Sequence, residues 1–488
     1  MTLLSRCFSL PHHSIAVVPA ATRPRCPNAV MRLVTLLLAV VAWFNVSART
    51  RAAEPSAEID AKKSPPNVLF ILADDLGRHQ VGCYGSRYYR TPHLDQLSRE
   101  GMQFQDAYAA APVCSPTRAS IMTGRSPARL HLTDYIPGRT PEGSTLEIPD
   151  WQKSLPLEEV TIAEHLRRAG YRTGHFGKWH LSPDKYYEPG RPGDPGSQGF
   201  DVVLTTHKPK AGPPSPIAQD WHHTRQIAKA ANEFVTAKSA KPFFCYVSFN
   251  AIHDPEIERP EIIGQFSQRE NSGGRKNPVQ AAMLFRTDEA IGSLLETLEV
   301  AGKASETLVI FFSDNGQKGP KTGDGFRGSK GDLYEGGIRM PLIVRWPSVV
   351  PAGSRCHTPV ISHDFLPTIV EAATGELPHD TLDGVSLLEL LRDPEASLPR
   401  QALHWHYPHY HSLGLGPQSA IRVGPMKLIM WHERVLLDQP DRYELYDLSV
   451  DPGERVDLSS TRPATTLKLV EHLNGWMKRV DAQMPVPR

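Results

Sequence analysis

The clearest pattern along the chain is a set of short apolar runs that each end in polar residues. Near-continuous apolar runs of this length are typical of strands that are buried on both faces of a sheet. The four runs are Asn67–Ala73, Tyr171–Phe176, Pro242–Phe249 and Leu308–Ser313. The polar residues that follow them are Asp74 and Asp75, Lys178 and His180, His253, and Asp314 and Asn315.

The segments between these runs carry helical signals. Thr161 with Glu164 three residues later forms a capping-box pattern at the start of a helix over 161–169. Helical spacing over 281–302 predicts a longer helix, and 342–346 reads as one more strand. Strands that alternate with helices predict an α/β fold with a large, central, mostly parallel or mixed sheet flanked by helices.

The pattern changes toward the C-terminus. Helices are predicted at 363–373 and 386–391, followed by short strand-like runs at 420–423, 427–430 and 443–446. An amphipathic segment covers 467–480. We therefore expect a catalytic domain over 54–399 and a C-terminal subdomain over 400–488, built from a small antiparallel sheet and a helix.

The N-terminus has the features of a targeting sequence. The apolar run Leu33–Phe44 follows Arg32, and small residues suited to cleavage lie at 46–48 and 52–53. We expect residues 1–53 to be a leader with a signal peptide, with Met31 as the true start. The run is short for a bilayer, so the mature protein is predicted to have no stable membrane span and to be exported, periplasmic or secreted.

The composition argues against two classes of protein, nucleic-acid-binding proteins and proteins held together by disulfides. The 54 Lys and Arg residues nearly balance the 53 Asp and Glu residues, which argues against nucleic-acid binding through bulk charge. Two of the six cysteines, Cys7 and Cys26, belong to the leader. If Cys114 is modified, the three that remain allow at most one disulfide, so the fold does not depend on a disulfide framework.

The stretch Ala111–Arg125 supplies the candidate nucleophile. Pro116 fits the first turn of a helix that begins near Cys114, and Gly124 ends it. A helix N-terminus favours an anion, and Arg118 lies close enough to face the same site. Parallel strands bring their carboxyl ends to one edge, where the polar clusters and Cys114 would build a site for a divalent cation and an anion together.

Several blocks resemble one family. The word Cys-Ser-Pro-Thr-Arg at 114–118, followed by Thr-Gly-Arg, resembles the signature of type I, formylglycine-dependent sulfatases of the arylsulfatase A-like kind. NVLFILADDLG, GYRTGHFGKWHL, SDNG, KGDLYEGGIRMP and ELYDLSVDPGE resemble further blocks in family order. The resemblance runs from about Asn67 to Val480 and implies an alkaline-phosphatase-like fold.

The resemblance also implies a cofactor set. A formylglycine-generating enzyme would convert Cys114 to 3-oxoalanine (formylglycine). One Ca²⁺ ion, or Mg²⁺, would be held by modified Cys114 together with Asp74, Asp75, Asp314 and Asn315. Carboxylate and amide oxygens are the ligands that these hard cations prefer.

Further roles follow from the same resemblance. His253 would protonate the leaving oxygen, and His180 would assist the loss of sulfate from the covalent intermediate. Lys178 and Lys330 would hold sulfate oxygens, and Arg118 would orient the nucleophile. Two positions depart from the family pattern, because Ser182 stands where a glycine is common and Ile252 where a proline often precedes the histidine.

The substrate is less constrained than the sulfate site. Family analogy favours a sulfated small molecule or glycan, with a carbohydrate sulfate preferred. The segment His404–His411, rich in histidine and aromatic residues, either lines the pocket rim or packs between domains. Two other functions remain open: a phosphonate or phosphodiester hydrolase of the same superfamily, and an inactive protein that binds sulfated glycans.

Overall fold

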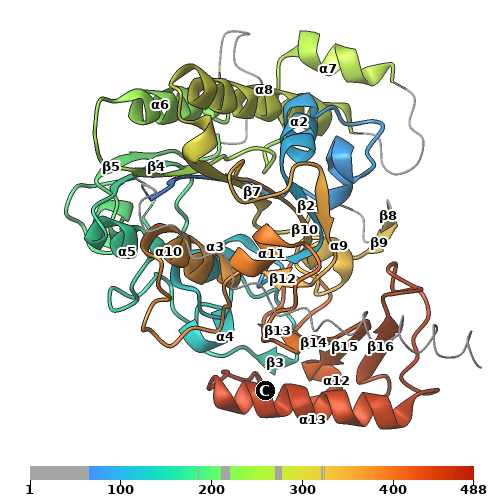
Figure 1. The fold of residues 1–488 in the computed structure, drawn as a ribbon. Helices are drawn as coiled ribbons and strands as arrows, with labels where there is room; N and C mark the ends of the chain where they lie inside the picture. The colour runs from blue at the N-terminus through green and yellow to red at the C-terminus, as the bar shows by residue number, and fades with distance from the viewer. Residues whose placement is uncertain (1–64, 185, 210–219, 270–276, 320–321, 324) are drawn as a thin grey trace, which may run out of the picture. The chain divides into compact units, whose positions relative to one another are not determined.

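A nine-stranded mixed sheet forms the centre of the computed structural model, which describes residues 65–488 except 185, 210–219, 270–276, 320–321 and 324 (Figure 1). The order is β11-β2-β10-β7-β1-β6-β4-β5, and β12 also pairs with β2. The strands are β1 (Asn67–Ala73), β2 (Met102–Tyr108), β4 (Arg172–Gly177), β5 (Val202–Thr205), β6 (Phe243–Ser248), β7 (Thr307–Ser313), β10 (Arg339–Arg345), β11 (Ser354–Cys356) and β12 (Val360–Ile361). The predicted sheet is confirmed.

The register places the ends of the central strands level with one another. β7, β1, β6, β4 and β5 are parallel, whereas β10 runs antiparallel to both β7 and β2. Ala73 pairs with Ser313, and Ser248 pairs with Leu72 and Gly177. The polar residues that follow these strands therefore start at the same edge of the sheet.

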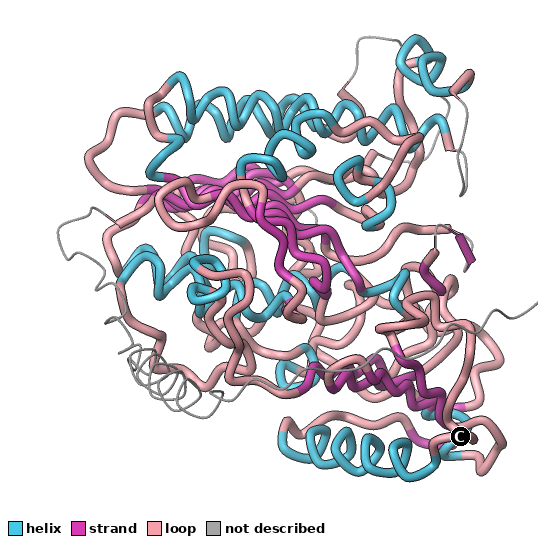
Figure 2. The backbone as a smooth tube through the Cα atoms, turned by 45° about the vertical axis from the view of Figure 1, so that its right-hand side comes forward, coloured by secondary structure: helices cyan, strands magenta, loops and turns pink. Residues whose placement is uncertain are grey.

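Helices cover both faces of this sheet, which lies as a layer between them (Figure 2). Along β1, Leu69 and Ile71 pack in one apolar cluster, and Val68 and Phe70 pack in another. The first face is covered by α2 (Pro92–Glu100), α6 (Thr224–Thr236) and α8 (Pro278–Val300), and the second by α3 (Cys114–Thr123), α5 (Ile162–Arg168) and α10 (Phe365–Thr374). Burial on both faces explains why β1 is apolar throughout from Val68 to Ala73.

Shorter elements complete the large unit. The helices are α4 (Pro127–Leu130), α7 (Pro260–Ser267), α9 (Glu335–Ile338) and α11 (Leu388–Arg392). The strands form two small pairs, β3 (Leu146–Glu147) with β17 (Val486–Pro487) and β8 (Thr322–Gly323) with β9 (Phe326–Arg327). The first pair joins a segment of the large unit to the C-terminal end of the chain.

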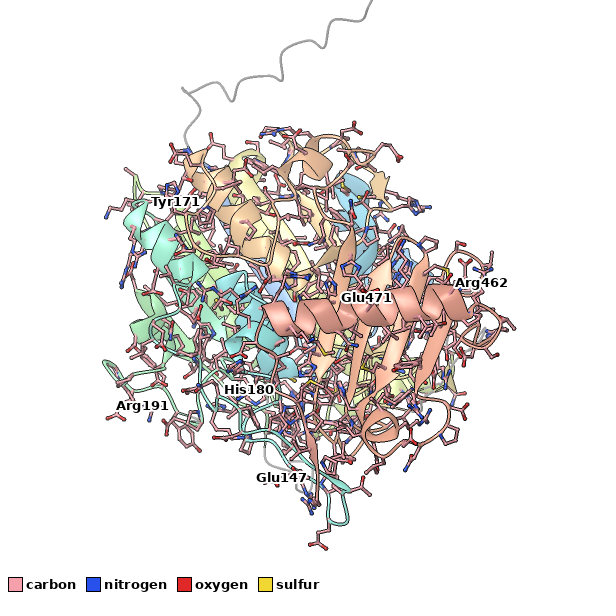
Figure 3. All side chains as sticks on the ribbon, turned by 90° about the horizontal axis from the view of Figure 1, so that it is seen from below. Glu147, Tyr171, His180, Arg191, Arg462 and Glu471 are labelled. Carbon is pink, nitrogen blue, oxygen red and sulfur yellow. The ribbon has the colours of Figure 1, made fainter. Side chains whose placement is uncertain are left out.

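A second, four-stranded antiparallel sheet lies near the C-terminus, as predicted. Its strands, in order, are β13 (Ala402–Tyr407), β14 (Gln418–Val423), β15 (Met426–Trp431) and β16 (Tyr443–Asp447), with α12 (His432–Leu436) after β15. Helix α13 (Pro463–Arg479), which contains Glu471, lies across one face (Figure 3). The other face packs on Tyr108 and Ala110 of the large unit.

The structure distinguishes between the two interpretations of the segment His404–His411, which were a pocket rim and packing between domains. Trp405 and Tyr407 are buried in the cluster between the two sheets, and Trp405 Nε1 donates to the Ala109 carbonyl at 2.9 Å. His409 is also buried and contacts Thr133 Oγ1 through Nε2 at 2.7 Å. Side chains packed in this way do not form a pocket rim, so the packing interpretation holds for them. The boundary at residues 399 and 400 stays a prediction.

The N-terminal predictions concern residues outside the described part of the chain. The leader over 1–53, the start at Met31 and the signal peptide all lie there. Among the described residues, no helix has the length and apolar character needed to cross a membrane.

Candidate active site

Cys114 lies at the N-terminus of the buried helix α3. Val113 caps the helix in an extended conformation, and Gly124 ends it with a left-handed φ of 66°. Cys114 Sγ is 3.5 Å from Asp74 Oδ1 and 3.9 Å from Asp75 Oδ1. Burial, followed by the nearby Asp314, raises the pKa of the Cys114 thiol, so the unmodified side chain is a neutral thiol and a poor nucleophile.

The four candidate oxygen ligands lie around this thiol. Asp75 adopts a left-handed φ of 61°, and its N–H donates to Asp314 Oδ1 at 3.2 Å. Asn315 Nδ2 donates to Asp75 Oδ1 at 2.7 Å. The Asp74 N–H donates to the Ala251 carbonyl at 3.2 Å, which connects the end of β1 to the loop after β6.

Three cationic side chains, Lys178, Lys330 and Arg118, reach these acids. Lys178 Nζ lies 2.7 Å from Asp74 Oδ2, and Lys330 Nζ lies 2.5 Å from Asp75 Oδ1. Lys330 Nζ is also 3.4 Å from Cys114 Sγ. The site therefore places two ammonium groups beside the thiol, where they can bind the oxygens of a tetrahedral anion.

Arg118 joins the ends of three strands. Its Nε donates to Asp314 Oδ2 at 2.9 Å, and its Nη1 donates to Ser248 Oγ at 2.6 Å and to the Lys178 carbonyl at 3.0 Å. Ser248, the last residue of β6, was not predicted as part of the site. Its position at the end of an apolar run is the only sequence signal for it.

Burial and neighbouring charges shift the pKa values of Asp74 and Asp314 in opposite directions. Burial alone would raise the pKa of Asp74, but Lys178, His253 and Arg118 outweigh it and hold the pKa well below its ordinary value. For Asp314, burial and the neighbouring Asp74 raise the pKa to about 6 despite Arg118. The cluster therefore keeps Asp74 ionised, whereas Asp314 is the carboxylate that ionises least readily.

His180 is held as a neutral proton acceptor. Its Nε2 lies 2.6 Å from the Ile136 carbonyl oxygen, which only accepts hydrogen bonds, so Nε2 carries the hydrogen. Nδ1 has no hydrogen-bond partner among the described residues. Burial and then the Lys178 charge lower the pKa of His180 well below its ordinary value. The ring thus keeps a free lone pair at Nδ1.

The position of His180 depends on one close backbone approach. β4 ends at Gly177, whose φ is 116°, and a Cβ atom there would lie 1.8 Å from the Ser248 carbonyl oxygen. Lys178 N–H donates to that same oxygen at 2.8 Å. Glycine is therefore required for the chain to leave the sheet and turn Lys178 and His180 toward the acids.

His253 faces the acids with its other ring nitrogen. Nε2 is 3.8 Å from Asp75 Oδ2, whereas Nδ1 is 2.9 Å from the Asp254 carbonyl oxygen and therefore carries the hydrogen. Burial lowers the pKa of His253 to about 4, although Asp75 works in the opposite direction. An anion bound beside the ring would favour its protonated form.

The donor set suits a hard cation. Atoms of Asp74, Asp75, Cys114 and His253 that could bind a metal all lie within 4.8 Å of one another. Asp75 Oδ2 and Asn315 Oδ1 are buried oxygens without a hydrogen-bond partner among the described residues, and a cation would satisfy both. The predicted set and this geometric group share Asp74, Asp75 and Cys114.

The C-terminal sheet contacts the loops that carry these residues. Gln418 Oε1, on β14, accepts from the Leu333 N–H at 3.0 Å, three residues after Lys330. Tyr407 OH, on β13, donates to Asp134 Oδ1 at 2.9 Å, two residues before Ile136. Neither contact was predicted, because the two partners of each contact are far apart in the sequence.

Family models match the chain over most of its length. The model described as Sulfatase matches residues 66–375, and the model described as N-sulphoglucosamine sulphohydrolase, C-terminal, matches residues 329–483. Human arylsulfatase A is 33% identical over 467 residues, which cover 84% of this chain and 86% of the relative.

Solved structures share the fold. The structure of Ps i-CgsB in complex with k-i-k-neocarrahexaose has a TM-score of 0.68 at 27% identity and covers 85% of this chain and 93% of that one. The phosphonate monoester hydrolase of Agrobacterium radiobacter has a TM-score of 0.63 at 20% identity and covers 87% of this chain and 99% of that one. The second likeness concerns the fold alone.

Proposed function

The chain belongs to the sulfatase family and is a sulfuric ester hydrolase, and from this premise we propose that it cleaves a carbohydrate sulfate with a formylglycine made from Cys114 beside a Ca²⁺ ion. One observation supports this most directly: Cys114 Sγ lies 3.4 Å from Lys330 Nζ and within 3.9 Å of both Asp74 and Asp75. The candidate nucleophile, the lysine that would bind the anion, and two candidate metal ligands therefore lie in contact with one another.

The state of the thiol supports the modification. A neutral, buried thiol attacks poorly, and the raised pKa of Cys114 keeps it in that form. A formylglycine at this position would supply a hydrated aldehyde as nucleophile and a carbonyl that can re-form after the reaction. A formylglycine-generating enzyme is the partner that this proposal requires.

The cation would be held by the residues that follow β1 and β7, namely Asp74, Asp75, Asp314 and Asn315, together with the modified Cys114. Their oxygens favour Ca²⁺ or Mg²⁺ over a softer metal. The cation would supply Lewis-acid stabilisation of the sulfate oxygens. Arg118, which contacts Asp314 and Ser248, would orient the nucleophile at position 114.

The chain's own side chains would handle the anion and the protons. Lys178 and Lys330 would bind the sulfate oxygens through charge-assisted hydrogen bonds. His253 would donate a proton from Nε2 to the leaving alcohol oxygen, because an alkoxide is a poor leaving group near neutral pH. His180 would accept a proton at Nδ1, the ring nitrogen that carries the free lone pair.

A carbohydrate is favoured as the rest of the substrate. One structural relative above 25% identity is described in complex with an oligosaccharide, k-i-k-neocarrahexaose. Export, which the sequence predicts from residues outside the described part of the chain, would suit an enzyme that acts on extracellular glycans. Both statements remain parts of the proposal.

Mass spectrometry of the Cys114 peptide tests the proposal. Protein produced together with a formylglycine-generating enzyme should carry the aldehyde at position 114 and hydrolyse an aryl sulfate. Cys114→Ala should lose the activity, whereas Cys83→Ala, which alters a free thiol outside the site, should keep it. An unmodified but active protein would refute the formylglycine, and faster turnover of an aryl phosphodiester would favour the phosphonate or phosphodiester alternative.

A further inference from the structure

A fourth cationic side chain, Lys208, lies beside His253 at the edge of the site. It follows β5, lies two residues after the buried Thr206, and is itself exposed. Lys208 Nζ lies 3.5 Å from His253 Nδ1. No motif of the sequence includes Lys208, and none of the roles above uses it.

The contact with His253 does not hold Lys208 in place. His253 Nδ1 carries its hydrogen toward the Asp254 carbonyl oxygen, so Nδ1 and the Lys208 ammonium are both donors. The Asp254 carboxylate is already paired with Lys318. Among the described residues, no carboxylate lies within ion-pair distance of Lys208, so none of them neutralises its charge.

The other cations at the site are all paired. Lys178 pairs with Asp74, Lys330 with Asp75, and Arg118 with Asp314. Lys208 is close enough to this cluster for like charges to act on it: burial and then the Lys178 charge lower the pKa of Lys208. An unpaired ammonium beside other cations is stabilised when an anion binds next to it.

We propose that Lys208 binds a second anionic group of the substrate, a carboxylate or a second sulfate, on the sugar that leaves with the alcohol oxygen. This inference rests on the proposed function, in which His253 acts on the leaving oxygen. A group that accepts a hydrogen bond from Lys208 lies beside the His253 ring and therefore on the leaving-group side of the scissile ester. The substrate class is accordingly a sulfated sugar with at least two negative charges.

Matched substrates test this assignment. The kcat/KM of the wild-type enzyme and of Lys208→Ala is measured on a sugar with one sulfate, on the same sugar with a second sulfate, and on a sulfated uronic acid. We expect Lys208→Ala to lower the ratio of dianionic to monoanionic kcat/KM by about tenfold. A fall in the ratio for the disulfated sugar identifies the second group as a sulfate, and a fall in the ratio for the sulfated uronic acid identifies it as a carboxylate.

Two further measurements separate the explanations. Lys318→Ala removes a neighbouring ammonium that is already paired with Asp254, and it should leave the ratio unchanged. Lys208→Arg should restore the ratio, because the charge is kept. Equal loss on all three substrates, or no loss on any, would overturn the subsite. Absence of turnover by the wild-type enzyme on every sulfate ester would instead overturn the proposed function.

Discussion

Substitution of Gln418 by leucine tests whether the C-terminal sheet positions Lys330. Gln418 is fully buried; its Oε1 accepts from the Leu333 N–H at 3.0 Å, and its Nε2 donates to the Gly416 carbonyl at 3.2 Å. Leucine keeps most of the volume but removes both hydrogen bonds. The loop that carries Lys330 would then lose its direct link to β14.

The magnitude follows from the groups left behind. The buried Leu333 N–H would have no acceptor, which costs about 1–3 kcal/mol. Other bonds still hold the loop, among them those from Lys330 N–H to the Gln317 carbonyl at 3.0 Å, from Gly331 N–H to the Pro112 carbonyl at 2.9 Å, and from Leu415 N–H to Asp332 Oδ1 at 3.1 Å. We therefore expect Lys330 to shift rather than to leave the site, with kcat/KM lowered about tenfold, which corresponds to roughly 1.4 kcal/mol.

The next residue on the strand provides the control. Ser419 is also buried, but it faces α13 and bonds to His406 and His432 at 2.7 and 2.8 Å. Ser419→Ala should destabilise the sheet by a comparable amount, measured by denaturant unfolding, and leave kcat/KM on an aryl sulfate nearly unchanged. If the two variants lose the same stability and the same activity, Gln418 has only a structural role and the positioning argument is wrong.

Three further outcomes follow from buried charges and the cation site. Lys427, with no exposed surface, lies 2.8 Å from both Glu335 and Glu454, so Lys427→Met should lower the free energy of unfolding by about 3–5 kcal/mol in denaturant titrations; an unchanged midpoint would contradict this. Burial raises the pKa of Glu335, but Lys427 outweighs burial and lowers this pKa from its ordinary value of 4.5. The stabilisation that the Glu335–Lys427 pair provides is therefore complete above pH 4.5 and is lost as the pH falls below that value. Melting temperatures between pH 5 and 3 should therefore fall more steeply for the wild type than for Glu335→Gln, and parallel curves would refute the assignment. Finally, Ca²⁺ at a hundred times its Kd should raise the free energy of unfolding of chelator-treated protein by about 2.7 kcal/mol, and Asp75→Asn should abolish this effect. If added Ca²⁺ does not change the stability of the wild-type protein, the predicted cation site is wrong.

Local sequence patterns determined the main elements of the fold. The apolar runs at 67–73 and 308–313 became β1 and β7 with the predicted bounds or within one residue of them, because a strand buried on both faces needs an unbroken apolar run. Thr161 and Glu164 form the predicted capping box, with Glu164 N–H donating to Thr161 Oγ1 at 3.2 Å. Capping and burial leave strong local signals, so these elements were readable in advance.

Elements with mixed composition were missed. β2, which contains Gln103, Gln105 and Asp106, lies inside the central sheet but has no continuous apolar run. β13 was missed because its histidines resemble a binding segment, although His406 and Trp405 are buried by partners on other elements. Their strand conformation depends on pairing with β10 and β14, and the sequence of one strand does not reveal its neighbours.

The sequence by itself determined which residues carry the chemistry. Short sequence motifs around Asp74, Cys114 and Asp314 identified the family. Because parallel strands end at the same edge of a sheet, residues as far apart in the sequence as Asp75 and Asn315, at a separation of 240, were expected to meet. Only the tertiary structure decided how they act: that Nδ1 of His180 keeps the lone pair, that Lys208 has no carboxylate beside it among the described residues, and that Gln418 supports the loop of Lys330. Hydrogen-bond direction and charge pairing are properties of distances between side chains, and those distances are fixed by the packing of the whole chain.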